Sequence, residues 1–236
     1  MTAPAGIRYL SPASSTTDMT DAPDRTTLDV RPSDKPRIPP GQSRTAKWPV
    51  LHNGGVPHVD IATWRLRVFG RCDAPFELTW GDLVAMPRQD TLCDIHCVTR
   101  WTRLDNRFEG VAVQPLLRRA RPHADATHVM VHAAPDFTTN LPLEDLDRPE
   151  NILALKHDGV DLTPEHGWPV RLLVPHLYLW KSAKWITGLE FMDGDQPGFW
   201  ERNGYHMYGD PWLEQRHSGP SIEQWMINKL RNASKK

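Results

Sequence analysis

Proline is the residue that most limits what this chain can fold into. Twenty-two prolines are spread over 236 residues, and each one fixes φ and removes a backbone N–H, which interrupts helices and central strands. This distribution argues against a helical bundle and predicts many irregular connections. Ten tryptophans add a second constraint, because rings of that size need large buried pockets or flat binding surfaces.

Between the prolines, the sequence has the pattern of many short strands and few short helices. WRLRVFG (64–70) alternates apolar and basic residues, as a half-buried strand does. Short helices are expected at GDLVAM, which Pro87 stops, and at PLLRRAR, which Pro115 opens. Further strands are expected at FELTW (76–80), 90–97, FEGVAV (108–113), HVMVHAA (128–134), ILALKHDG (152–159), WPVRLLVP (168–175) and WITGLEFMD (185–193), and an amphipathic helix at 221–232. The pattern predicts an α+β fold with mixed β-sheets and short helices.

The chain is expected to hold one domain preceded by a tail. Residues 1–42 are rich in Pro, Ser, Thr and Asp and have little periodic hydrophobicity, which predicts a flexible N-terminal tail. Ordered structure is expected to begin near Trp48, and residues 43–236 are expected to form a single domain.

Charge and hydropathy exclude several kinds of partner. The formal net charge is −1, so nothing in the overall charge indicates nucleic acid or an anionic membrane. No stretch approaches the roughly 18 apolar residues of a membrane-spanning helix, and the first forty residues contain no apolar run of signal-peptide length. We therefore expect a cytoplasmic location and no stable membrane anchor. Cys72, Cys93 and Cys97 do not describe a disulfide framework and are expected to be free thiols.

Cys97 is the first candidate site residue. It ends an expected strand in the stretch CDIHCVTRW and is followed by Arg100 and Arg103. Guanidinium charge lowers the pKa of a nearby thiol, and the thiolate is the form that binds a soft metal. A buried structural cysteine is the alternative. A zinc site with Cys93 and His96 is conceivable, but structural zinc requires four ligands and the sequence has no second cysteine pair.

The turn Lys181-Ser182-Ala183-Lys184 is a second candidate, because it offers two ammonium groups, a hydroxyl and backbone amides to an anion such as phosphate. A solvated loop is the alternative, although apolar residues flank the turn. Arg171 interrupts the apolar strand VRLLVP, and a buried guanidinium must find an anion or a carboxylate. A structural salt bridge and a cofactor contact both meet that requirement.

Four stretches together resemble the sulfite-oxidase-like molybdopterin-binding oxidoreductases. They are CDIHCVTRW (93–101), HVMVHAAPDFTTNLPLEDL (128–146), HGWPVRLLVPHLYLWKSAKWITGLEFMD (166–193) and FWERNGYHMYGDPWLEQR (199–216). The resemblance runs from about Trp48 to Arg216 and is nearest to small stand-alone cytoplasmic members. It implies the molybdopterin-binding fold and a molybdenum–molybdopterin cofactor. The implied activity is oxygen-atom transfer to or from a small sulfur- or oxyanion-type substrate.

The resemblance also implies roles for individual residues. Cys97 matches the family's protein ligand to molybdenum, and Arg171 matches a partner of the pterin phosphate. The other cofactor-binding residues that it implies are His52 or Asn53, Thr138 or Thr139, His166 beside Gly167, and Lys181, Ser182, Ala183 and Lys184. Arg100 and Arg103 are expected to hold an oxyanion substrate or to stabilise developing charge, and a surface salt bridge to Asp105 is the alternative for Arg103.

Two alternatives to the oxidoreductase hypothesis stay open. One is a non-catalytic molybdopterin-binding module, and the other is a zinc hydrolase using Cys93, His96 and Cys97. The sequence has no GxGxxG, GxSxG, CxxCH or Walker glycine motif, and thus no signature of a second redox centre. Because molybdenum must be re-oxidised or re-reduced after each turnover, the family resemblance implies a separate electron-transfer partner. The segment 199–216 is either a docking surface or lid, or a packed C-terminal strap.

Overall fold

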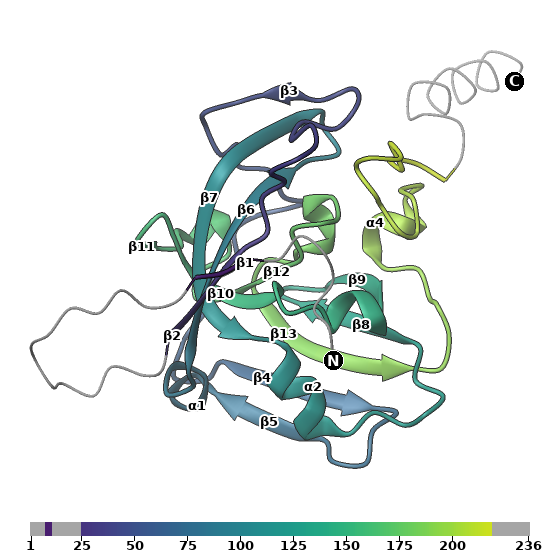
Figure 1. Ribbon diagram of the computed structural model, residues 1–236. Coiled ribbons are helices and arrows are strands. Elements are labelled where there is room, and N and C mark those ends of the chain that lie inside the picture. Colours follow the sequence, from purple (N-terminus) through teal and green to yellow (C-terminus); the bar gives the residue numbers. More distant parts are fainter. Residues whose placement is uncertain (1–7, 11–24, 219–236) are drawn as a thin grey trace, which may run out of the picture.

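The computed structural model describes residues 8–10 and 25–218. Two mixed β-sheets form the framework of the fold (Figure 1). The larger sheet has the order β1-β2-β6-β7-β10-β11, with β12 beside β10 and β3 beside β7. Its strands are β1 (Arg8–Leu10), β2 (Arg25–Asp29), β3 (Ser43–Arg44), β6 (Arg88–His96), β7 (Trp101–Ala112), β10 (Ile152–His157), β11 (Val160–Asp161) and β12 (Arg171–Leu173). The smaller sheet has the order β5-β4-β13-β8-β9. Its strands are β4 (Arg65–Gly70), β5 (Phe76–Thr79), β8 (His128–Ala133), β9 (Phe137–Pro142) and β13 (Ile186–Met192).

Parallel and antiparallel pairs occur in both sheets. β2 runs parallel to β6 and β3 to β7 in the larger sheet, and β4 runs parallel to β13 in the smaller one. The other pairs of these strands are antiparallel. The predicted α+β class with mixed sheets is therefore confirmed.

Short helices connect the strands. They are α1 (Trp80–Val84), α2 (Gln114–Ala120), α3 (Leu143–Leu146), α4 (Phe199–Arg202) and the 3₁₀ helices η1 (Pro164–His166) and η2 (Leu179–Lys181). α1 begins with a capping box, in which the Thr79 hydroxyl accepts from the Asp82 N–H at 3.1 Å and the Thr79 N–H donates to Asp82 Oδ2 at 2.8 Å. Pro115 lies in the first turn of α2, as predicted. None of the helices among the described residues is long and apolar enough to cross a membrane.

The hydrophobic core is formed by both sheets and α2, and β10 is buried on both of its faces. Leu153 and Leu155 belong to the main cluster, together with residues of β4, β8, β13 and α2. Ile152 and Ala154, which point to the opposite face, belong to a second cluster with Phe108. Two-sided burial explains why this strand is a continuous apolar run in the sequence rather than an alternating one.

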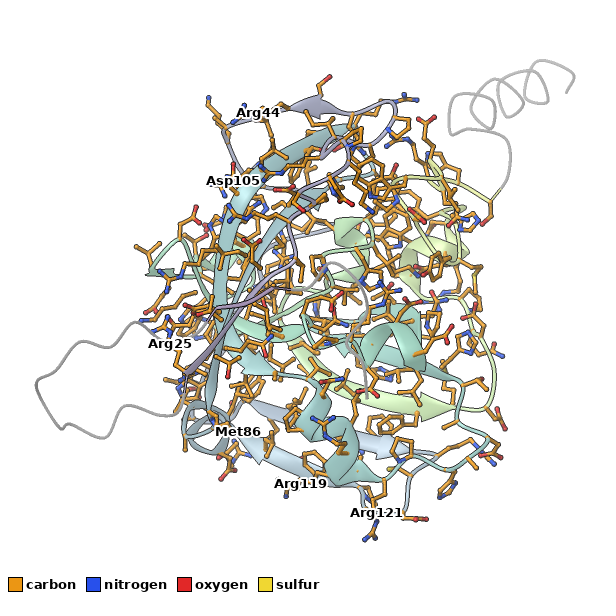
Figure 2. All side chains as sticks on the ribbon, viewed as in Figure 1. Arg25, Arg44, Met86, Asp105, Arg119 and Arg121 are labelled. Carbon is orange, nitrogen blue, oxygen red and sulfur yellow. The ribbon has the colours of Figure 1, made fainter. Side chains whose placement is uncertain are left out.

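The N-terminal segment is part of the larger sheet. β2 pairs with β6 over five residues, and Arg25 forms an ion pair of 2.7 Å with Asp90, whose side chain is fully buried. Arg37 binds the nearly buried Asp94 at 2.5 Å. Arg25 and Asp105 mark the side of the sheet on which these ion pairs lie (Figure 2). The predicted start of order near Trp48 is therefore wrong, and so is the flexible tail for residues 25–42. The helix expected at 221–232 lies outside the described residues.

Gly110 lies where β7 approaches β10 most closely, because a Cβ at this position would be 2.1 Å from the Leu153 carbonyl oxygen. We expect Gly110→Ala to lower the free energy of unfolding by about 1–3 kcal/mol, since the strands must move apart to accommodate the methyl group. Gly194→Ala is the control, because a Cβ there meets nothing within 4 Å. Urea denaturation measures both variants, and equal midpoints would show that β10 moves away at little cost.

Candidate active site

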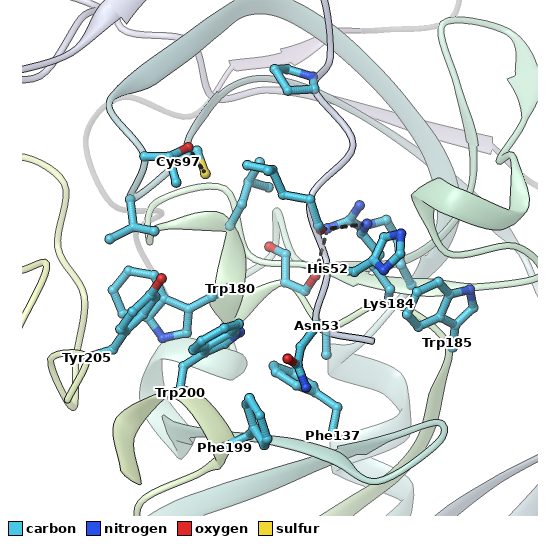
Figure 3. A pocket seen from close by; sticks show the side chains of 18 of the residues that line it. His52, Asn53, Cys97, Phe137, Trp180, Lys184, Trp185, Phe199, Trp200 and Tyr205 are labelled. Carbon is cyan, nitrogen blue, oxygen red and sulfur yellow. Dashed lines mark hydrogen bonds between the residues drawn. The ribbon is translucent and has the colours of Figure 1, made fainter. Parts of the chain in front are cut away.

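A cavity of about 470 Å³ is lined by segments that lie far apart in the sequence (Figure 3). They are the loop 48–53, the turn 97–101 after β6, the β8–β9 turn 134–137, the stretch 179–185 that includes η2, and the segment 199–205 that includes α4. This volume lies in the range of small-molecule and cofactor sites in proteins.

Cys97 lies on the cavity wall at the first position after β6. The turn that holds it is closed by hydrogen bonds from the Arg100 N–H to the Cys97 carbonyl at 3.0 Å and from the Cys97 N–H to the Trp101 carbonyl at 2.9 Å. Its Sγ is 3.2 Å from the Thr99 hydroxyl. Burial raises the pKa of the Cys97 thiol, while the Thr99 hydrogen bond and the charge of Arg216 act in the opposite direction. A metal cation at the sulfur would stabilise the thiolate against the cost of burial.

Arg171 and Lys184 bring two positive charges to the cavity without a carboxylate partner in the described part of the chain. Both donate to neutral main-chain carbonyls instead. The acceptors are His166 (3.1 Å) and Ser182 (2.7 Å) for Arg171, and Leu51 (2.9 Å) and Glu165 (2.6 Å) for Lys184. Burial lowers the pKa of Arg171 to about 10. Burial, together with repulsion by Arg171, lowers the pKa of Lys184 to about 7. An anionic group in the cavity would supply the missing counter-charge.

Aromatic side chains form most of the remaining wall (Figure 3). They are Trp48, Trp101, Phe137, Trp180, Trp185, Phe199, Trp200 and Tyr205. The Tyr205 ring stacks on Trp200 at 4.9 Å and meets Trp180 edge-on at 5.1 Å. The Trp101 Nε1–H is buried without a hydrogen-bond partner. The high tryptophan content predicted such a surface, but these rings come from five separate segments, so their positions were not predicted.

Lys181 does not line the cavity, although it lies in the same turn as Lys184. Its Nζ is fully buried and donates to Glu201 Oε1 and to Asn140 Oδ1, both at 2.7 Å. Glu201 Oε1 also accepts from the Trp180 indole N–H at 2.8 Å and from the Thr139 hydroxyl at 3.1 Å. This network fixes α4, and with it the aromatic wall, to β9 and η2.

The other predicted residues divide into two groups. Residues that line the cavity are His52, Asn53, Cys97, Arg171, Ser182, Ala183 and Lys184, whereas Arg100, Arg103, Thr138, His166 and Lys181 are not among the lining residues. The Ser182 hydroxyl accepts from the Val174 N–H at 2.9 Å, so it stabilises the turn. His166 supports the wall from behind, because its ring stacks on Trp48 at 4.1 Å. Thr138 lies on β9 with a buried hydroxyl that has no partner.

The two arginines after Cys97 point elsewhere. Arg100 is exposed and takes a positive φ of 70° in the turn. Arg103 binds Asp158 at 2.7 Å and contacts His157 at 2.9 Å. The alternative salt bridge of Arg103 with Asp105 is wrong, because Asp105 pairs with arginines of the N-terminal segment. This placement does not support a substrate-binding role for either arginine.

The zinc alternative lacks a ligand set. Among the described residues, no three His, Cys, Asp or Glu side chains are grouped so that they could hold a metal ion. Cys93 is buried in the second core cluster, and His96 Nδ1 lies 2.9 Å from the Thr102 hydroxyl. Cys72 is a free, buried thiol of the main core, as predicted.

Comparison with known proteins identifies the family of the chain. The family model of the oxidoreductase molybdopterin binding domain matches residues 53–200. The uncharacterized oxidoreductase YuiH of Bacillus subtilis is 50% identical over 181 residues, which cover 76% of this chain and 91% of that protein. The putative protein-methionine-sulfoxide reductase subunit YedZ1 of Azospira oryzae is 30% identical over 154 residues, which cover 65% of this chain and 58% of that protein. The crystal structure of the sulfane dehydrogenase SoxCD from Paracoccus pantotrophus matches with a TM-score of 0.56 and 23% identity, covering 61% of this chain and 41% of that one.

The cavity and these matches define an enzyme of the molybdopterin-dependent oxidoreductase class. Within that class, the chain belongs to the sulfite-oxidase-like family with an oxidoreductase molybdopterin-binding domain. The residues present fit the cofactor of this family, because the cavity combines a thiol, two cations that lack carboxylate partners among the described residues, and an unpaired indole N–H.

Removing the charge of Glu201 tests the buried network behind the aromatic wall. We expect Glu201→Gln to lower the free energy of unfolding by about 3–5 kcal/mol, because it leaves the buried Lys181 ammonium without its carboxylate. Asp125→Asn is the control, since it breaks the exposed ion pair with Arg71 and should change stability much less. Guanidinium denaturation compares the two variants, and equal losses would contradict a structural role of the Lys181–Glu201 pair.

Proposed function

We propose that this protein catalyses oxygen-atom transfer with Cys97 as the protein ligand to molybdenum. The observation that supports the proposal best is the position of the Cys97 thiol on the wall of a cavity that also holds two cations without carboxylate partners among the described residues. Thiolate is a ligand that soft metals prefer. When bound, the cofactor supplies the two-electron redox chemistry, and the protein binds it, orients it and sets its electrostatic environment.

Arg171 and Lys184 are the residues that we assign to the anionic part of the cofactor. The pKa of Lys184 is lowered to about 7. A bound anion stabilises the protonated ammonium and therefore raises this pKa again. The hydrogen bonds of both side chains to main-chain carbonyls hold them at the cavity before the cofactor binds. His52 and Asn53 lie in the loop whose Leu51 carbonyl accepts from Lys184, and they are the polar groups of the loop 48–53 that can complete the site (Figure 3).

The lining of the cavity supports a neutral organic substrate over an inorganic oxyanion. Apart from Arg171 and Lys184, no Arg or Lys is among the lining residues in the described part of the chain. Because we assign these two cations to the cofactor, no further cation is left to bind a sulfite-like anion. A sulfoxide is neutral, and its apolar substituents suit the rings of Trp200, Phe137 and Phe199. The relative from Azospira oryzae, at 30% identity, is named a putative protein-methionine-sulfoxide reductase subunit, and one from Campylobacter jejuni, at 24% identity, is named a protein-methionine-sulfoxide reductase catalytic subunit.

Tyr205 is the group that we assign to the oxygen atom of the substrate. Its hydroxyl points toward the part of the cavity that holds Cys97 (Figure 3). Burial, with a contribution from Cys97, raises the pKa of Tyr205, so the hydroxyl keeps its proton and acts as a hydrogen-bond donor. Reduction of a sulfoxide consumes two electrons and two protons and releases water, so the reaction needs a separate electron donor. The relatives' names as a reductase subunit and a catalytic subunit support such a partner. The cytoplasmic location stays a prediction.

Replacing Cys97 tests the ligand assignment. We expect Cys97→Ala to lower turnover by more than about 100-fold, since loss of a metal's supporting interactions alone costs 10–100-fold, while the unfolding midpoint stays close to that of the wild type. Cys72→Ala is a matched control, because both thiols are 8% exposed and Cys72 lies in the main core. Molybdenum content by mass spectrometry and turnover with a reduced dye are measured on both variants. Wild-type turnover in Cys97→Ala would contradict the ligand role, and normal molybdenum without any redox response in the wild type would favour the non-catalytic module.

The substrate class is tested by comparing an aryl methyl sulfoxide, assayed with a reduced dye, with sulfite, assayed with ferricyanide. We expect kcat/KM for the sulfoxide to exceed that for sulfite by at least about tenfold, because apolar contacts contribute discrimination of this order. Trp200→Leu should raise KM for the sulfoxide about tenfold for the same reason and leave the molybdenum content unchanged. Faster turnover of sulfite would show that the cavity accepts an oxyanion.

A further inference from the structure

Residues on both sides of the matched region 53–200 reach the turn that carries Cys97. From the N-terminal side, the Gln42 side-chain amide donates to the Cys97 carbonyl at 3.1 Å, and the Ser43 N–H donates to the Arg100 carbonyl at 2.9 Å. From the C-terminal side, Arg216 Nη1 donates to the Val98 carbonyl at 2.9 Å. The turn is therefore held by groups that the family match does not include.

Arg216 joins three segments of the chain at this turn. Besides the Val98 carbonyl, its Nη2 lies 3.4 Å from the Pro40 carbonyl oxygen and 3.5 Å from that of Gly41. Its guanidinium lies over the Tyr178 ring, 5.1 Å from the ring centroid. A planar guanidinium with several fixed donors suits such a junction, because each N–H has a set direction.

The charge of Arg216 is only weakly compensated within the described residues. The residue is 6% exposed, its hydrogen-bond acceptors are neutral carbonyls, and its Nε–H is buried without a partner. Glu214 is its one carboxylate partner among the described residues, at 3.6 Å and with a half-exposed side chain. A buried cation in this state favours negative charge nearby, and the adjacent residue on the turn is Cys97.

We propose that Arg216 is a positioning residue for the metal-ligand turn, which fixes the Val98 backbone and keeps a positive charge close to the Cys97 sulfur. The inference rests on the proposed ligand role of Cys97. A positive charge near a metal favours its more electron-rich state, so Arg216 raises the midpoint potential of the bound metal. Its hydrogen bonds also restrict local opening of residues 97–101.

The test compares three variants of the holoenzyme. Arg216→Met removes the charge and the hydrogen bonds, and Arg216→Lys keeps the charge but loses the planar donor set. Arg119→Met removes an exposed charge of α2 that does not line the cavity. The measurements are the midpoint potential in a redox titration, the thiolate-to-metal absorption band, and hydrogen exchange of residues 97–101. For Arg216→Met we expect a lower midpoint potential, a shifted absorption band and faster hydrogen exchange of residues 97–101. For Arg216→Lys we expect faster hydrogen exchange with a midpoint potential near that of the wild type. Arg119→Met should change none of these.

A folded, molybdenum-loaded Arg216→Met protein with wild-type potential and wild-type exchange would overturn the proposal. If Arg216→Met does not fold or does not bind molybdenum, the positioning role is tested with Arg216→Lys and Gln42→Met. Gln42→Met removes the donor to the Cys97 carbonyl and leaves the charge of Arg216 in place. Faster exchange of residues 97–101 in both supports the positioning role, and unchanged exchange in both refutes it. A wild-type protein without molybdenum would overturn the proposed function instead, and the exchange of Arg216→Lys would still decide the positioning role.

Discussion

Two cations without carboxylate partners among the described residues, the buried Arg171 and the half-buried Lys184, are the constraint on which the rest of the site depends. Arg171 gives up water and gains only neutral carbonyls in return, an arrangement that costs several kcal/mol for an ion in a protein interior. Lys184 likewise donates only to main-chain carbonyls. The fold tolerates this because β12 and the following turn are fixed by the surrounding core. An anionic ligand removes the deficit, so its binding also stabilises the folded state by mass action.

Lys181 shows the opposite solution within the same turn. Three residues before Lys184, it is more deeply buried, yet it has a full set of acceptors that includes the Glu201 carboxylate. The two lysines look equivalent in the sequence motif, but contacts with β9, α4 and the Met207 carbonyl are made by Lys181 alone. One ammonium therefore lines the cavity, whereas the other fixes the wall that surrounds it. This division explains why a single motif is needed both for binding and for stability.

The sequence predicted the elements that local patterns control. Alternation identified β4, prolines delimited α1 and α2, and the interrupted apolar strand identified Arg171 as unusual. β9, with the sequence FTTNLP, has no alternation of apolar and polar residues, because its buried Thr139 and Asn140 bond to the Lys181 network. β2 was missed because its pairing with β6 is non-local. The error on Arg103 has a similar origin, since the length and pairing of β7 bring it beside Asp158 rather than Asp105. The aromatic wall depends on tertiary contacts among several loops, which no local pattern encodes.

Segments that flank the matched domain shape the surroundings of Cys97. At 23% identity, the likeness to the sulfane dehydrogenase structure establishes the fold alone, and the matched domain supplies the thiol, Arg171 and Lys184. The side chains of Gln42 and Arg216, which donate hydrogen bonds to the Cys97 turn, lie on either side of that domain. Tyr205 lies shortly after its end at residue 200. Changes in these segments alter the environment of the sulfur and the shape of the substrate wall without disturbing the two sheets. The surroundings of Cys97 therefore depend on residues outside the matched domain as well as on the domain itself.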